Sequence, residues 1–223
     1  MSRLSEPGLL VLHAVRVRGT ADPDAVAARY GLDVEVVQEL LLDLEALGQV
    51  RWAAFGGTGG WSLTERGRAE DERLLAAELA GDPDGRAAAV VGDVLHAFAP
   101  LNARLLRACT DWQLRPADAG RLDVNDHADA AWDAHVLDEL AAVVHAAHPL
   151  LAALAAELRR FDGYDARLDD ALAAARAGDG ARVAGVGAAS VHGVWMELHE
   201  DLLATAGITR SAPPDPRARR GPH

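Results

Sequence analysis

The sequence has one cysteine, no lysine and few aromatic residues. Cys109 is the only cysteine among 223 residues, which excludes an intramolecular disulfide and a cluster of several thiolates on one metal within the chain. This usage is typical of a reducing compartment. The apolar stretch near the N-terminus is too short to span a membrane, and no small-residue cleavage site follows it. We therefore expect this stretch to begin a core helix of a cytoplasmic protein with no membrane partner.

Basic charge is scarce. All 22 basic residues are arginines, against 34 Asp and Glu, and the formal net charge at pH 7 is -12. Such a charge repels a phosphate backbone rather than steering toward it. Through residue 75 alone there are eight Arg and twelve Asp plus Glu, a net of -4. Any nucleic-acid contact must therefore come from a local group of arginines.

Catalytic motifs are absent as well. The sequence has no nucleophile elbow, phosphate loop or zinc-protease motif. The run "GGTGG" is not followed by Lys-Ser or Lys-Thr, and "AGVGAAS" lacks the preceding strand that a dinucleotide fingerprint needs. We expect a protein that is not an enzyme, and the sequence identifies no cofactor.

Ala, Leu and Val dominate the composition, which favours helix over sheet. Apolar spacings of three and four predict helices over residues 7–20, 22–31 and 33–48. Asp22 and Asp33 are candidate N-caps, and Gly48 ends the third helix. A short helix, a tight turn and a longer helix together are typical of a helix-turn-helix.

The next segment predicts a β-hairpin. "QVRWAAF" is strand-like, "GGTGG" is a flexible tip and "WSLT" is a return strand. Thr64 is a candidate cap for the helix that follows. Three helices and an arginine-flanked hairpin predict a winged helix, with the hairpin as the wing.

The run "LEALGQVRW" followed by "GGWSLTERGRAE" resembles the wing region of bacterial winged-helix transcriptional regulators of the MarR type. In that family a strand containing "LT" and a following "GR" close the wing. The resemblance covers about the first third of the chain. It implies a dimeric regulator that binds double-stranded DNA.

After a hinge-like Gly, Pro and Asp segment at residues 80–86, the pattern is helical to about residue 207. We expect Pro100 and Pro149 to kink or split their helices and residues 113–124 to form a loop. Asn125 or Asp126 is the expected cap of the next helix. The predicted fold is mainly α, with a winged helix-turn-helix domain at 1–80, an all-helical ligand-sensing or dimerisation domain at 81–207, and a disordered tail at 208–223. The last helix is expected to begin after Ser190 and to end at Gly207.

The candidate DNA-binding residues centre on the hairpin. Arginines on either side of a glycine-rich tip can clamp phosphates, while the tip itself approaches the duplex closely. Support is expected from arginines of the first two helices, and an outward-facing glutamine can pair with adenine. The set is Arg51, Thr58, Arg66, Arg68, Arg16, Arg18, Arg29 and Gln38. Against this set, the recognition helix carries Glu35, Glu39, Asp43 and Glu45.

The helical domain holds candidate ligand-binding residues. Tryptophans and histidines that line a space between helices suit a planar effector, and a buried amide needs a partner. The set is Asn102, Trp112, His127, Trp132, His192, Trp195 and His199. The alternative is that the tryptophans simply fill the core, and the histidines leave a metal site open without defining its ligands.

These patterns favour a homodimeric DNA-binding regulator whose helical domain dimerises, senses a small-molecule effector, or does both. The acidic recognition helix favours one alternative, a winged helix that binds proteins instead of DNA. The histidines favour another, a protein that carries a small ligand or a metal.

Overall fold

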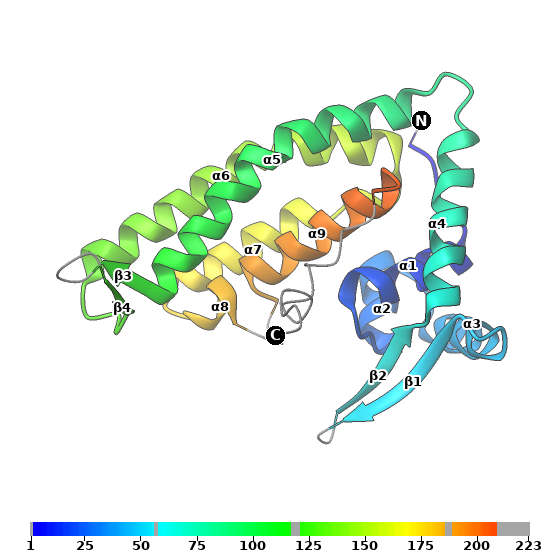
Figure 1. Ribbon diagram of the computed structural model, residues 1–223, viewed down its shortest axis with the longest axis horizontal. Coiled ribbons are helices and arrows are strands. Elements are labelled where there is room, and N and C mark those ends of the chain that lie inside the picture. The colour runs from blue at the N-terminus through cyan, green and yellow to red at the C-terminus, as the bar shows by residue number, and fades with distance from the viewer. Residues whose placement is uncertain (1, 56–57, 117–120, 186–188, 209–223) are drawn as a thin grey trace, which may run out of the picture.

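The computed structural model describes residues 2–55, 58–116, 121–185 and 189–208, apart from the side chains of Phe55 and Thr58, and its fold is mainly α. Three helices, a hairpin and a fourth helix form the N-terminal part (Figure 1). They are α1 (Pro7–Arg18), α2 (Pro23–Tyr30), α3 (Val34–Ala46), β1 (Val50–Phe55), β2 (Thr58–Leu63) and α4 (Glu65–Ala80).

Three helix starts in this part confirm the predicted caps. The carboxylates of Asp22 and Asp33 and the hydroxyl of Thr64 each accept a hydrogen bond from a backbone N–H of the following turn, at 2.8, 2.8 and 3.0 Å. These bonds satisfy donors that have no partner within the helix. The turn between α2 and α3 is short because Gly31, with φ of 64°, ends α2 in the left-handed conformation.

The hairpin is antiparallel, and it extends away from the helices (Figure 1). Trp52 pairs with Trp61 across the two strands, and their rings meet edge to face at 5.5 Å. Trp61 is buried and also bonds to Ala21, just before α2, whereas Trp52 is half exposed. One face of the hairpin is therefore anchored to the helices, and the other is open.

The C-terminal part is helical. Its elements are α5 (Arg86–Gln113), β3 (Leu114–Pro116), β4 (Leu122–Val124), α6 (Ala130–Glu157), the 3₁₀ turn η2 (Arg159–Phe161), α7 (Tyr164–Arg176), α8 (Ala181–Ala184) and α9 (Val191–Thr205). The long helices α5 and α6 lie side by side, and α9 lies between α7 and the N-terminal part (Figure 1). Ser190 caps α9, as predicted, by accepting from the N–H of Gly193.

Three local predictions are wrong. Of the two outcomes predicted for Pro100 and Pro149, a kink or a split, the split is wrong, because α5 and α6 run continuously through them. Residues 114–116 and 122–124 pair as a short antiparallel ladder instead of forming only a loop. The N-cap of α6 is Asp129, which accepts from two backbone N–H groups, and not Asn125 or Asp126.

The buried apolar side chains form two main clusters. One joins α1, α2, α3 and the hairpin, and the other joins α5, α6, α7, α8 and α9. A small third cluster of Leu9, Leu75 and Ala204 connects α1, α4 and α9. The two main clusters lie on either side of the domain boundary predicted near residue 80. Of the predicted tail, residues 209–223 lie outside the described residues.

Helix α6 is the one helix in the described ranges that is long and apolar enough to cross a membrane, judged by length and composition alone. The core helix of a protein without any membrane contact passes the same test. The evidence for a membrane span is therefore weak.

Candidate functional site

Helices α1, α4 and α9 meet in a fully buried ionic contact. Nδ1 of His13 lies 3.1 Å from Asp71, and Nε2 lies 3.0 Å from Asp201, in an orientation that suits an ion pair better than a hydrogen bond. Burial alone would lower the pKa of His13, but the two carboxylates outweigh it and raise this pKa to about 9. His13 therefore carries a positive charge at neutral pH in the folded protein.

A second buried cation extends this contact toward η2. Arg160 lies 2.6 Å from Asp201 and 3.2 Å from Glu78, and it donates to the hydroxyl of Thr205 at 2.8 Å. Burial opposes the ionisation of Asp201, but Arg160 and His13 together lower its pKa to about 2. Asp201 thus connects the N-terminal helix α1 with the C-terminal turn η2 through two positive charges.

Two of the supporting arginines predicted to contact DNA are used inside the molecule. The buried Arg16 pairs with Asp71, Glu72 and Glu200, the last at 3.0 Å. Arg29 donates to backbone carbonyls at the turn between η2 and α7, at 2.7 and 2.8 Å, and lies against the rings of Tyr30 and Tyr164. The expected role of Arg16 needs correction, because a phosphate cannot reach its guanidinium.

Arg18 and Arg68 are also tied to α9. Arg18 lies 3.4 Å from Glu197, and Arg68, whose side chain is half exposed, lies 3.7 Å from Glu200. The arginines of α1 and α2 therefore face the C-terminal helices. Only the hairpin side of the N-terminal part keeps the predicted arginines exposed.

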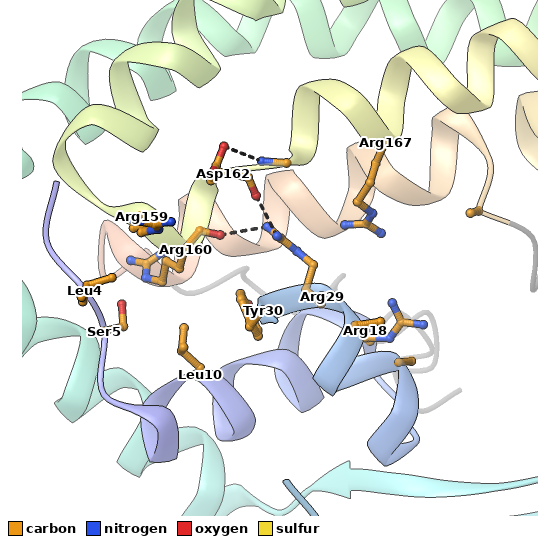
Figure 2. Close-up of a pocket in the computed structure, with 14 residues that line it drawn as sticks. Leu4, Ser5, Leu10, Arg18, Arg29, Tyr30, Arg159, Arg160, Asp162 and Arg167 are labelled. Carbon is orange, nitrogen blue, oxygen red and sulfur yellow. Dashed lines mark hydrogen bonds between the residues drawn. The ribbon is translucent and has the colours of Figure 1, made fainter. Parts of the chain in front are cut away.

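A cavity of about 660 Å³ opens where α1 and α2 face η2 and α7 (Figure 2). Its wall is rich in arginine and includes one acidic residue. The charged lining residues are Arg18, Arg29, Arg159, Arg160, Arg167 and Asp162. Leu4, Leu10 and Ala28 supply apolar wall. This volume lies within the usual range for small-molecule sites.

Three buried polar atoms on residues of this wall have no hydrogen-bond partner among the described residues. They are Nε of Arg18, Nη1 of Arg167 and the hydroxyl oxygen of Tyr30. Glu197 holds the other nitrogens of both arginines, at 3.4 and 2.6 Å, and so fixes their positions. Each unpartnered buried group costs about 1–3 kcal/mol. Residues of the wall thus carry buried donors that have no acceptor among the described residues.

The hairpin side presents a different surface. Arg51 on β1 and Arg66 on α4 are exposed, and among the described residues Arg66 interacts with the carboxylate of Glu70 only through a weaker Coulombic contact. Gln38 on α3 is exposed as predicted, and the side chain of Thr58 lies outside the described residues. Arg51 and Arg66 are the two hairpin cations best placed to meet an external anion.

The exposed face of α3 is acidic and partly apolar. Glu35, Glu39 and Asp43 are exposed beside two large apolar side chains, Val36 and Leu42, which are 44% and 58% exposed. Leu47, just after the helix, is also exposed. This face repels phosphate, and it offers apolar area to another surface.

The predicted ligand-binding residues do not meet in one place. Trp195 is fully buried, stacks on Phe98 at 4.6 Å, and donates its indole N–H to Asn102 at 3.0 Å. The ring of Phe98 also contacts His199. The two functional groups that suggested an effector contact, the Asn102 amide oxygen and the Trp195 N–H, bond to each other.

A second group of these residues lies at the β3–β4 end of α5 and α6. His127 contacts the ring of Trp112 at 4.6 Å and lies 3.0 Å from Asp133. Trp132 donates its indole N–H to the carbonyl of Asp111 at 2.8 Å. His192 belongs to neither group, and it lines a second cavity between α1 and α9. These contacts indicate that most of the aromatic residues predicted to bind a ligand pack the helices instead.

Cys109 and the metal alternative remain to be placed. Burial raises the pKa of the Cys109 thiol to about 11, so this thiol is protonated at neutral pH. Within the described part of the chain, no group of three or more His, Cys, Asp or Glu is placed to hold a metal ion.

Sequence patterns did not identify Arg159, Arg160, Arg167 or Glu197 as site residues. They fall on three elements, η2, α7 and α9, so no local spacing relates all of them. The adjacent pair Arg159 and Arg160 at the end of an apolar helix is the one signal that points to this place. Comparisons with protein-family models, with curated proteins and with solved structures return no match for this chain.

Proposed function

We propose that the protein is a DNA-binding transcriptional regulator, with residues 1–80 acting as a winged helix. The observation that carries the proposal is the tight α2–α3 turn followed by a hairpin that extends away from the rest of the molecule (Figure 1). A helix pair presented with such a hairpin is a common means of docking on a duplex.

In this proposal the hairpin side makes the phosphate contacts. Arg51 and Arg66 are exposed, and among the described residues Arg66 has only a Coulombic interaction with Glu70, which Arg73 already pairs with, so both charges are available to a polyanion. Arg68 is a weaker contributor because Glu200 competes for it. Gln38 is the candidate for base contact, since amides pair with adenine.

The remaining parts of the proposal concern assembly and control. A homodimer doubles a weak contact made by few cations, and a small-molecule effector bound at the helical part changes the relative placement of two winged helices. We place this activity in the cytoplasm, where the single buried cysteine stays reduced.

Binding of mixed-sequence duplex DNA, followed by fluorescence anisotropy over a salt series, tests the proposal. We expect retention that weakens as salt rises from about 50 to about 200 mM. The double variant Arg51→Ala, Arg66→Ala should reduce the slope of log K against log salt by about 2, because each phosphate contact contributes about 0.9.

The matched control is Arg104→Ala, Arg176→Ala, which removes the same charge from exposed ion pairs on the C-terminal helices. This control should bind DNA as the unaltered chain does. Equal losses in both double variants, or no retention at the lowest salt, would contradict the proposal.

The second candidate function is a winged helix that binds another protein. The exposed Val36, Leu42 and Leu47 beside the acidic residues of α3 favour it, because apolar area ringed by charge is typical of protein interfaces. Loss of a pulled-down partner in Leu42→Asp, together with no DNA retention, would favour this function over the first.

A further inference from the structure

The cavity between α1–α2 and η2–α7 differs in charge from the rest of the molecule. The whole chain has a formal net charge of -12, yet five arginines and a single acidic residue line this wall. Two of these arginines, Arg29 and Arg159, form no ion pair with any carboxylate of the described residues. Carboxylates behind the wall balance the other three arginines, so Arg29 and Arg159 supply the positive charge that favours an anion.

The donors are also held in place before any ligand arrives. Two backbone carbonyls and the rings of Tyr30 and Tyr164 fix the guanidinium of Arg29. The carboxylate of Glu197 fixes Arg18 and Arg167, two of the arginines labelled in Figure 2. Donors that are ordered in advance bind a charged ligand with less loss of side-chain entropy.

The unpartnered atoms specify the chemistry of the ligand. Nε of Arg18 and Nη1 of Arg167 only donate hydrogen bonds, and the hydroxyl of Tyr30 has a proton to donate. Burial raises the pKa of Tyr30, which keeps this hydroxyl protonated at neutral pH. Three donors without acceptors match a group with several acceptor oxygens, such as a carboxylate or a phosphate.

We infer that this cavity binds a small organic anion, with its carboxylate or phosphate against Arg18, Arg29, Arg167 and Tyr30 and its apolar part along Leu4 and Leu10. The ligand touches α1 and α2 on one side and α7 on the other, so it strengthens the contact between the N- and C-terminal parts. The inference goes beyond the proposed function and does not depend on DNA binding.

The test measures thermal unfolding of the full chain with rising inorganic phosphate, hexanoate or hexanamide at constant ionic strength. A ligand that binds only the folded state raises the unfolding temperature in a saturable way. We expect this rise with hexanoate, with phosphate or with both, and none with neutral hexanamide. The phosphate and hexanoate arms distinguish which oxyanion the site prefers.

Two variants test whether the anion binds in this cavity. Tyr30→Phe removes a hydroxyl that has no hydrogen-bond partner among the described residues, so the protein should fold normally while affinity for the anion falls about tenfold. Arg29→Gln should abolish the saturable rise. Arg176→Gln, which removes an exposed arginine of α7 that pairs with Asp138, is the control and should bind as the unaltered chain does.

Two results would overturn the inference. One is the absence of any saturable anion effect beyond that of sodium chloride. The other is equal affinity in the unaltered chain and in Tyr30→Phe, which would place the anion elsewhere. Neither result depends on duplex DNA. Failure of the anion site can therefore be distinguished from failure of the proposed DNA-binding function.

Discussion

At the scale of single residues, His13 links stability to pH. Its pKa is about 9 in the folded chain and near 6.5 when unfolded, because Asp71 and Asp201 hold its proton. A raised pKa stabilises the fold fully below pH 6.5, and this contribution is lost as pH rises toward 9. We expect the free energy of unfolding, measured with urea, to fall over this window by up to about 1.4 kcal/mol per pH unit.

The variant His13→Gln removes this titration, and it also removes one of the two positive charges that lower the pKa of Asp201. The stability difference between the two proteins should narrow steadily from pH 6.5 to pH 9. A difference that stays constant over this window would show that His13 is not charged in the folded state.

At the scale of elements, Gly67 sets how closely α4 approaches the start of the hairpin. A Cβ at this buried position would overlap the backbone carbonyl of Gln49. We expect Gly67→Ala to lower the free energy of unfolding by about 1–3 kcal/mol, since backbone must move to admit the methyl group. The glycine of the "GR" in the wing motif is therefore needed in this chain because a larger residue would collide with the backbone of Gln49.

Gly92→Ala is the matched comparison, because Gly92 is exposed on α5 and nothing lies near its added Cβ. It should raise stability by about 0.5–1 kcal/mol, the usual gain of Ala over Gly in a helix. Urea unfolding of both variants checks the pair. Equal stabilities would mean that the α4–hairpin contact is looser than the geometry indicates.

The helices and strands also differ in how far a sequence pattern can predict them. The caps Asp22, Asp33, Thr64 and Ser190 were predictable because capping acts within one helical turn. The β3–β4 ladder was missed because three-residue strands carry too few side chains to show alternation.

The candidate site was less predictable for a related reason. Arg16 and Glu200 are 184 residues apart, and in the sequence Arg16 is indistinguishable from a solvated surface arginine. Similarly, the amide of Asn102 and the indole of Trp195 each suggested a ligand contact until the fold paired them. Long-range polar partners follow from the packing of helices, which local spacing does not encode.

At the scale of the whole molecule, Asp201 is a buried ionic link between the N- and C-terminal parts. It is fully buried, and it is the shared counter-ion of His13 on α1 and Arg160 on η2. Asp201→Ala leaves two buried cations without this partner and should lower stability by about 3–5 kcal/mol. The pair Asp138–Arg176 is exposed, so Asp138→Ala should cost at most about 1 kcal/mol.

Differential scanning calorimetry tests whether the two parts unfold together. The unaltered chain should unfold in one transition, because the apolar clusters on either side of residue 80 are joined through Asp201 and its partners. In Asp201→Ala the transition should separate into two, with the part that contains α1 to α3 melting first because its apolar cluster is smaller. A single transition in Asp201→Ala, shifted no further than that of Asp138→Ala, would mean that the apolar contact of Leu9, Leu75 and Ala204 and the remaining ion pairs, such as Arg16–Glu200, hold the two parts together without Asp201.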